Sequence, residues 1–180
     1  FELRQAIRYL KDSVGVNQLV LDLRGNGGGL LQESISIVNL FVEKGQEVVS
    51  TRGKKEEWMK SYSTMAPPLV PDLPVAVLID EQSASASEIV SGTLQDLDRA
   101  IIVGQESFGK GLVQQTKPLA YGTKLKVTVA KYYTASGRCI QRLDYGGERE
   151  EDGSARAFSD STRQVFYTRN GRPVTDGAGV

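Results

Sequence analysis

Residues 75–97, VAVLIDEQSASASEIVSGTLQDL, decide the fold of this 180-residue chain. The run from Val75 to Ile79 is wholly apolar, which is typical of a parallel-sheet strand with both faces covered. From residue 85 onward, apolar side chains recur at helical spacing as far as Leu97. The stretch therefore predicts a buried strand, a serine-rich turn and a helix.

The alternation of strands and helices continues on both sides of this stretch. Short apolar runs predict further strands over residues 19–23, 47–51, 100–103 and 125–133. Helical spacing predicts helices over residues 1–12 and 30–43. Such an alternation indicates an α/β fold, and we expect a mainly parallel sheet.

Residues 52–74 are charged and contain four prolines, which predicts a surface loop or lid. Trp58, Met59 and Tyr62 in this segment are interpreted as residues that pack the loop against the core, with substrate contact as the alternative. Residues 143–180 are polar, and we interpret them as an extension of a single domain whose core spans residues 1–142.

Composition restricts the class of partner. The 22 basic and 22 acidic residues cancel, which argues against nucleic acid or an anionic membrane surface as the main partner. There is no histidine, and Cys139 is the single cysteine, so we expect no zinc site, no internal disulfide and no cofactor. The chain begins inside a predicted helix without an initiator methionine, which indicates a fragment whose targeting signals lie elsewhere.

Ser85 stands at the junction between the predicted strand and the predicted helix. The first turn of a helix offers free N–H groups and the positive end of the dipole, which suit an oxyanion hole. The amide of Ala86 is the expected first donor, and the glycine loop 25–29 is expected to bring a second from Gly28. The simpler interpretation is helix capping, because Ser85 and Glu88 form an S-x-x-E capping box.

Lys110 is the candidate base. Without histidine the Ser-His-Asp mechanism is excluded, whereas a neutral lysine can activate a serine. The apolar and glycine neighbours of Lys110 in FGKGLV favour the neutral amine, because desolvation disfavours its cation. The alternative is an ordinary surface lysine in a glycine turn.

Two glycine-rich motifs imitate nucleotide-binding sites. Gly104 to Lys110 fits G-x-x-x-x-G-K, but Gly111 stands where a P-loop needs serine or threonine. The 25–29 loop has Leu30 where a dinucleotide fingerprint needs its third glycine. We therefore do not expect nucleotide binding.

Four separated motifs occur in an order that resembles the C-terminal processing, or tail-specific, serine peptidases. They are LVLDLRGNGGGLL (19–31), SASASEIVSGTLQD (83–96), VGQESFGKGLVQ (103–114) and KYYTASGR (131–138). The resemblance covers most of residues 16–142 and implies a layered ββα core of the crotonase/ClpP-like type.

The resemblance implies that Ser85 is the nucleophile and Lys110 its general base. It also implies an oxyanion hole formed by the amides of Gly28 and Ala86. The implied activity is cleavage of proteins near exposed C-termini through an acyl-enzyme. The implied location is the bacterial periplasm or cell envelope, in a full-length form that can be membrane-associated. The alternative is a non-catalytic module of the same fold that binds apolar ligands.

Two further positions matching the family are Gln114 and Asp96. Gln114 is implied to support Lys110, although an extended strand would separate them by ~13 Å, so a bend near Gly111 is required. Asp96 has been linked to activity in the family. It lies about three helical turns, or ~16 Å, beyond Ser85, so we expect at most a supporting role.

Overall fold

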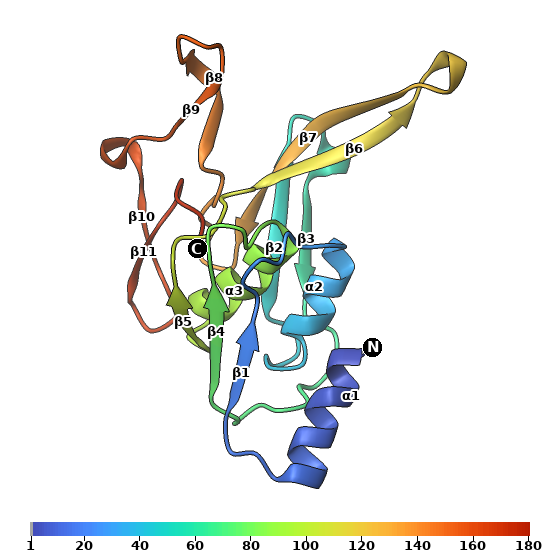
Figure 1. Ribbon diagram of the computed structural model, residues 1–180, viewed down its shortest axis with the longest axis vertical. Coiled ribbons are helices and arrows are strands. Elements are labelled where there is room, and N and C mark those ends of the chain that lie inside the picture. Colours follow the sequence, from blue (N-terminus) through green and yellow to red (C-terminus); the bar gives the residue numbers. More distant parts are fainter. Residues whose placement is uncertain (1) are drawn as a thin grey trace.

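The computed structural model describes residues 2–180. Its first sheet is parallel and three-stranded, in the order β1 (Leu19–Asp22), β4 (Val75–Ile79) and β5 (Ile101–Gly104) (Figure 1). Central Val77 is completely buried and pairs with residues of both neighbouring strands. Since parallel strands end at one edge of the sheet, the glycine loop after β1 and the serine turn after β4 lie side by side.

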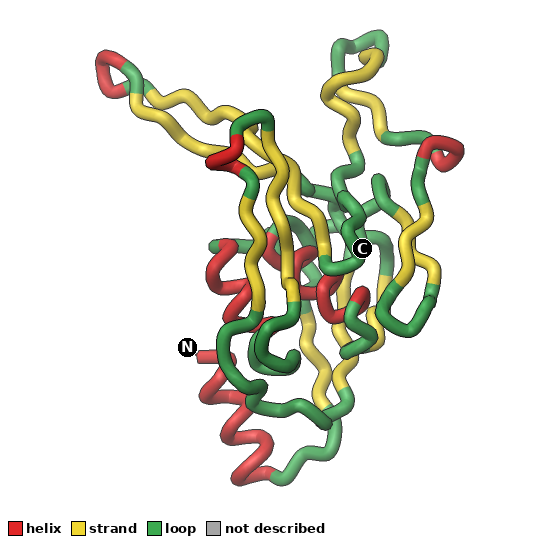
Figure 2. The backbone as a smooth tube through the Cα atoms, turned by 180° about the vertical axis from the view of Figure 1, so that it is seen from behind, coloured by secondary structure: helices red, strands yellow, loops and turns green. Residues whose placement is uncertain are grey.

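The second sheet is antiparallel. Its order is β3 (Lys60–Ser63), β2 (Glu47–Gly53), β7 (Lys124–Thr134) and β6 (Leu112–Pro118). β6 and β7 continue beyond their neighbours as a long hairpin that projects from the body, as Figure 2 shows from behind. The tip of the hairpin is a 3-10 turn, Ala120–Gly122.

Helix α3 (Ala86–Asp96) is the centre of the core. It contacts β5 of the parallel sheet, β2 and β7 of the antiparallel sheet, and α2 (Leu31–Val38). Ile89 and Leu94 on α3 are almost inaccessible to solvent. The third helix, α1 (Glu2–Tyr9), continues into a short π-helical segment and buries Ile7. Because α3 is buried between the two sheets, its N-terminal end, which follows Ser85, is held in place.

The C-terminal part of the chain consists of two hairpins. β8 (Leu143–Arg149) pairs with β9 (Ala155–Ala157), and β10 (Val165–Tyr167) pairs with β11 (Pro173–Thr175). Two further 3-10 turns occupy Glu56–Trp58 and Asp160–Thr162. No helix within residues 2–180 combines the length and the apolar character needed to cross a bilayer.

The predicted α/β class is confirmed, but a mainly parallel sheet is not. Parallel pairing is confined to β1, β4 and β5. Short connections join β2 to β3 and β6 to β7, which gives antiparallel pairs. β2 and β7 are far apart in the sequence and also pair antiparallel. The prediction of a loop over residues 52–74 was wrong for residues 60–63, which form β3 and pair with β2. Tyr62 packs against the core, as the packing interpretation expects. That interpretation is wrong for Met59, which is 56% exposed.

Candidate active site

Ser85 has a strained backbone. Its φ is +58° and its ψ is −112°, in a region that residues with a side chain seldom adopt. The strain arises where β4 turns sharply into α3. A nucleophilic serine on a strained strand-to-helix turn is a recurrent arrangement in hydrolases, because the turn presents the hydroxyl outward. The conformation therefore favours a functional role for Ser85 in addition to capping.

The two neighbouring serines hold the turn in place. Ser83 is completely buried, and its hydroxyl donates to the Leu23 carbonyl at 2.7 Å. The Ser87 hydroxyl donates to Asn26 Oδ1 at 3.0 Å. Both serines therefore connect the α3 turn to the end of β1 and the loop that follows it, and Ser85 lies between them, half-buried.

Glu88 joins the two halves of the candidate site. Its carboxylate is fully buried and accepts four hydrogen bonds. Oε2 accepts from the backbone N–H of Ser85 at 2.8 Å and of Lys110 at 2.9 Å. Oε1 accepts from the Ser107 hydroxyl at 2.6 Å and from the Gly109 N–H at 2.6 Å. The predicted capping box is confirmed, and the same carboxylate fixes the loop that carries Lys110.

Lys110 follows a glycine that cannot be replaced without strain. Gly109 has a φ of +81°, and a Cβ there would lie 2.5 Å from the Cβ of Arg142. Lys110 itself is half-buried, and within residues 2–180 its ammonium forms no ion pair. It lines a hollow of about 540 Å³ together with Leu112, Gln114 and other residues. Gln114 thus shares this hollow with Lys110, but no hydrogen bond joins the two side chains in the described part of the chain.

The glycine loop packs directly against the serine turn. Gly28 has a φ of +92°, and a Cβ there would lie 2.5 Å from the Ala84 carbonyl oxygen and 2.7 Å from the Ala86 nitrogen. Only glycine fits this approach. The structure therefore brings Gly28 and Ala86 together, although the Gly28 N–H donates to Asn26 Oδ1 at 2.9 Å. Asn26 also accepts from the Ala84 N–H through its carbonyl, at 3.0 Å.

Asp80 holds the base of the glycine loop, and sequence reasoning missed it. Its carboxylate accepts the Gly25 N–H at 2.9 Å, and this hydrogen bond is the main cause that lowers the pKa of Asp80. The same carboxylate accepts the N–H of Gln82 and of Ser83. The available signal was a short polar residue in the turn that follows a predicted strand, and Asn26 is in the same position after the preceding strand. Both side chains accept hydrogen bonds from backbone N–H groups two or three residues ahead.

An apolar pocket opens beside Gly28 and Ala86. Its volume is about 250 Å³, and its walls include Leu23, Ile37 and Val90. These three side chains come from β1's end, α2 and α3. The pocket therefore lies directly beside the close approach of Gly28 to Ala86.

Asp96 lies at the other end of α3 from Ser85. Its carboxylate forms a buried ion pair with Arg138 at 3.2 Å, accepts the Ser136 N–H at 3.0 Å and accepts the Thr134 hydroxyl. These contacts fasten the turn that follows β7. Asp96 therefore belongs to a structural cluster and contacts neither Ser85 nor Lys110.

The described residues contain no group of three or more histidine, cysteine, aspartate or glutamate side chains positioned to hold a metal ion.

Comparison with known proteins finds a family that matches this chain. A model of peptidase family S41 matches residues 1–146. The carboxy-terminal-processing protease of Bartonella bacilliformis is 46% identical over 145 residues, covering 79% of this chain and 33% of that protein. The carboxyl-terminal-processing protease of a Picosynechococcus species is 44% identical over 129 residues, covering 72% and 30%. The chain thus spans about a third of the length of these curated relatives.

The fold has solved counterparts. The photosystem II D1 C-terminal processing protease is 36% identical and superposes with a TM-score of 0.70, covering 77% of this chain and 35% of that one. The two sequence relatives and the solved D1 protease are all named as C-terminal processing proteases. The resemblance seen in the four motifs is therefore confirmed.

Proposed function

The chain belongs to peptidase family S41, and from this premise we propose that it is the core of a serine endopeptidase with a Ser85–Lys110 dyad, cleaving proteins near their C-termini. The observation that carries the proposal is the strained backbone of Ser85, held by Glu88 together with the backbone of Lys110. A strained nucleophile and a half-buried lysine secured by one carboxylate suit acyl transfer without histidine.

The mechanism follows from these positions. The Ser85 Oγ attacks the scissile carbonyl carbon while neutral Lys110 accepts the hydroxyl proton. The N–H groups of Ala86 and Gly28 stabilise the oxyanion, with the substrate oxygen replacing Asn26 Oδ1 as the acceptor for Gly28. Lys110 then gives the proton to the leaving amine. Water hydrolyses the acyl-enzyme with Lys110 again acting as base.

The wider context is part of the same proposal. α3 lies between a parallel and an antiparallel sheet, which supports the crotonase/ClpP-like layering. Relatives named as C-terminal processing proteases support protein substrates with exposed C-termini. The periplasmic or cell-envelope location is proposed from the family resemblance. The alternative of a non-catalytic apolar-ligand module is not favoured, because the relatives are named as proteases.

Covalent labelling tests the nucleophile directly. A fluorophosphonate probe should label the chain at Ser85, because an activated hydroxyl attacks phosphorus as it attacks a carbonyl. Mass spectrometry of the digested adduct should locate the probe on Ser85. Ser85→Ala should remove the label. Labelling of Ser85→Ala equal to that of the unaltered chain would refute the assignment.

The apolar pocket predicts the side chain preferred before the scissile bond. We expect small or medium apolar residues there, because the pocket holds about 250 Å³ and is walled by Leu23, Ile37 and Val90. Val90→Phe should fill the pocket and lower kcat/KM for a leucine substrate about tenfold or more, with a smaller loss for alanine. Peptide pairs that differ only at this position measure the change. An equal loss for both peptides would instead indicate general misfolding.

A further inference from the structure

Ser107 is a buried polar residue that contacts the candidate site through Glu88. It lies in the loop that leads from β5 to Lys110 and is completely inaccessible to solvent. Its hydroxyl donates to Glu88 Oε1 at 2.6 Å, and the same hydroxyl oxygen accepts the Val180 N–H at 2.8 Å. A serine hydroxyl carries one proton, and a donor that occupies its lone pair leaves that proton for Glu88. Ser107 thus connects the carboxylate that holds the dyad to residue 180.

The 177–180 segment is bonded to Ser107 in both directions. The Ser107 N–H donates to the Val180 carbonyl at 3.2 Å, while the Val180 N–H donates to the Ser107 hydroxyl. The Val180 side chain packs against the hydrophobic core, and a Cβ added to Gly92 on α3 would lie 3.2 Å from it. Val180 therefore lies between α3 and the loop that carries Ser107.

Gly179 approaches Ser107 too closely for a residue with a side chain. Its φ is +83°, and a Cβ there would lie 2.6 Å from the Ser107 Oγ and 2.8 Å from the Ser107 carbonyl oxygen. A side chain at residue 179 would therefore displace Ser107. Because the shortest of these contacts is with the hydroxyl itself, the hydrogen bond from Ser107 to Glu88 would be disturbed directly.

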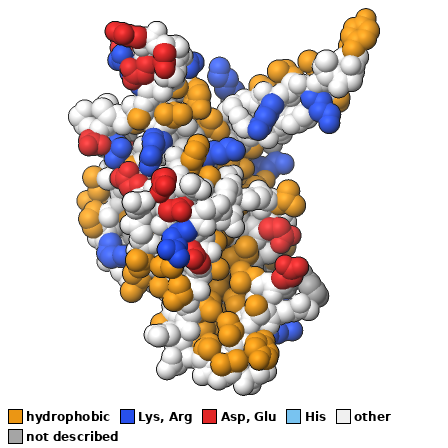
Figure 3. All heavy atoms as spheres, viewed as in Figure 1, with side chains coloured by type: hydrophobic (Ala, Val, Ile, Leu, Met, Phe, Trp, Pro, Cys, Tyr) orange, Lys and Arg blue, Asp and Glu red, His pale blue; other side chains and the backbone are white. Residues whose placement is uncertain are grey.

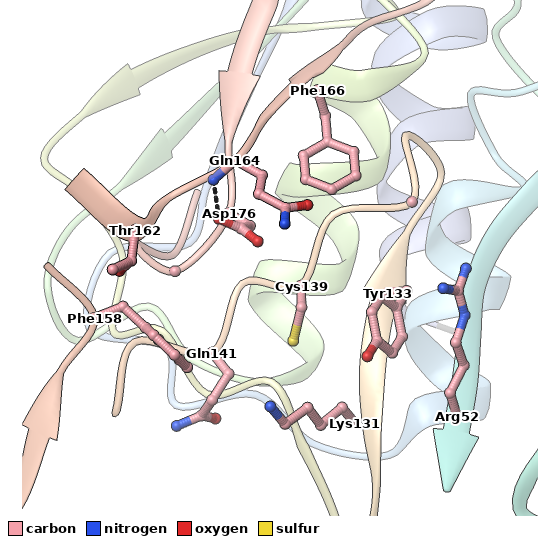
Figure 4. Close-up of a pocket in the computed structure, with 12 residues that line it drawn as sticks. Arg52, Lys131, Tyr133, Cys139, Gln141, Phe158, Thr162, Gln164, Phe166 and Asp176 are labelled. Carbon is pink, nitrogen blue, oxygen red and sulfur yellow. Dashed lines mark hydrogen bonds between the residues drawn. The ribbon is translucent and has the colours of Figure 1, made fainter. Parts of the chain in front are cut away.

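The start of the segment is fixed by its neighbours. The Gly177 N–H donates to the Cys139 carbonyl at 2.9 Å. Just before the segment, Asp176 Oδ1 accepts the Gln164 N–H at 2.8 Å, the hydrogen bond that is dashed in Figure 4. The segment is therefore held by hydrogen bonds before it reaches Ser107.

Arg142 joins the segment to the loop that carries the lysine. Its Nη2 donates to the Ser107 carbonyl at 2.7 Å and to the carbonyl of buried Ala178 at 3.2 Å. Its backbone N–H donates to the Gly109 carbonyl at 3.0 Å. One arginine thus bonds to residues on both sides of Phe108 and to the 177–180 segment, so the two stretches are held together.

Glu88 depends on internal donors for its orientation. Many charged side chains lie on the surface that Figure 3 shows, where water solvates them, whereas Glu88 is fully buried. A buried carboxylate is held by the hydrogen bonds that satisfy it. Of its four donors within residues 2–180, Ser107 supplies a side chain and the other three supply backbone N–H groups.

We propose that Ser107 and Gly179 are positioning residues for the dyad. The 177–180 segment holds the Ser107 hydroxyl on Glu88 Oε1, and Glu88 holds the backbones of Ser85 and Lys110 through Oε2. This role rests on the proposed function. The family model matches residues 1–146, so the alignment of nucleophile and base is completed by residues beyond that match.

Two glycine variants test the role. Gly179 and Gly171 have φ values of +83° and +82°, so alanine costs the backbone a similar amount at each, but a Cβ at residue 171 meets no atom within 4 Å. Gly179→Ala should lower kcat for a peptide substrate about 10- to 100-fold with little change in KM, because a small displacement of reacting groups is costly while the substrate pockets remain. Gly171→Ala should keep kcat within about twofold. Both are measured well below their unfolding temperatures.

Ser107→Ala tests the same contact from the other side. It removes the hydroxyl that Gly179→Ala displaces, so it should lower kcat by a similar factor. The double variant should cost little more than either single variant, because both changes act through one hydrogen bond. Multiplied losses in the double variant would overturn the role, and so would equal kcat values for Gly179→Ala and Gly171→Ala.

Amide hydrogen exchange measures the alignment without catalysis. The N–H groups of Ser85 and Lys110 should exchange about tenfold faster or more in Gly179→Ala, because both donate to the carboxylate that Ser107 orients. The Val77 N–H in the central strand should stay protected, and Gly171→Ala should change none of the three. If the unaltered chain cleaves no peptide, the proposed function fails, and exchange still decides the positioning role. Unchanged exchange at Ser85 and Lys110 in Gly179→Ala would overturn that role.

Discussion

Lys110→Met should reduce kcat/KM for a peptide substrate by a factor of at least about 10³, with little change in KM. Methionine keeps the length and apolar stem of the side chain but has no amine to accept the serine proton. The N–H donors and the substrate pockets remain, so weak binding and residual turnover should persist. Initial rates over a range of peptide concentrations measure the effect.

The partner variants make this prediction specific to a dyad. Ser85→Ala should cost about as much as Lys110→Met, and the double variant should cost little more than either, because groups that act as a unit are not additive. Lys117→Met, on the exposed part of β6, should leave kcat within about twofold of the unaltered chain, as expected for a surface change away from the site. A Lys110→Met chain that retains full turnover would exclude the lysine as base.

The parallel part of the fold was predictable because its signals are local. β1 and β4 are apolar runs, although Val20 on β1 is 60% exposed, so only β4 has the covered faces that its sequence predicts. α3 shows an apolar period, and tertiary packing buries nearly all of its residues. The antiparallel pairing was not predictable in the same way. Residues 60–63 form β3 although their sequence, KSYS, is polar, because β2 supplies backbone partners and Tyr62 alone reaches the core. Pairing of this kind depends on the neighbour rather than on the strand's own sequence.

In the candidate site, too, the local features were predictable from the sequence and the long-range contacts were not. Ser85 and Gly28 could be proposed from the sequence because a serine-rich turn and a glycine-rich loop are recognisable from a few adjacent residues. The connection between Ser85 and Lys110 could not, since it passes through the interior as Glu88 bonds to a loop 21 and 22 residues away. The sequence predicts Glu88 as part of a capping box. Only the three-dimensional structure shows that the same carboxylate also binds the backbone of Gly109 and Lys110. Asn26 likewise carries a long-range contact, to Ser87, that no spacing reveals.

Because Glu88 binds the backbone of both Ser85 and Lys110, its substitution should affect both turnover and stability. Glu88→Gln should lower kcat about 10²-fold or more and destabilise the fold by about 2–4 kcal/mol. Each carboxylate oxygen accepts two hydrogen bonds, so an amide nitrogen in place of either oxygen would face two donors. If it replaces Oε2, the N–H groups of Ser85 and Lys110 both lose their acceptor. Thermal unfolding and peptide kinetics, measured on the same sample, separate the two consequences.

Glu106→Gln provides the control, because Glu106 lies in the same loop with 64% of its side chain exposed and pairs with Arg142 at the surface. A surface ion pair contributes little, so its stability and turnover should change only slightly. The decisive comparison is kcat well below the unfolding temperature, where Glu88→Gln remains folded. A normal kcat there would mean that Glu88 serves stability alone, and that Ser85 and Lys110 keep their alignment without it. A low kcat with unchanged KM would show that one buried carboxylate, rather than the direct meeting of two side chains, aligns a nucleophile and base that lie on different loops.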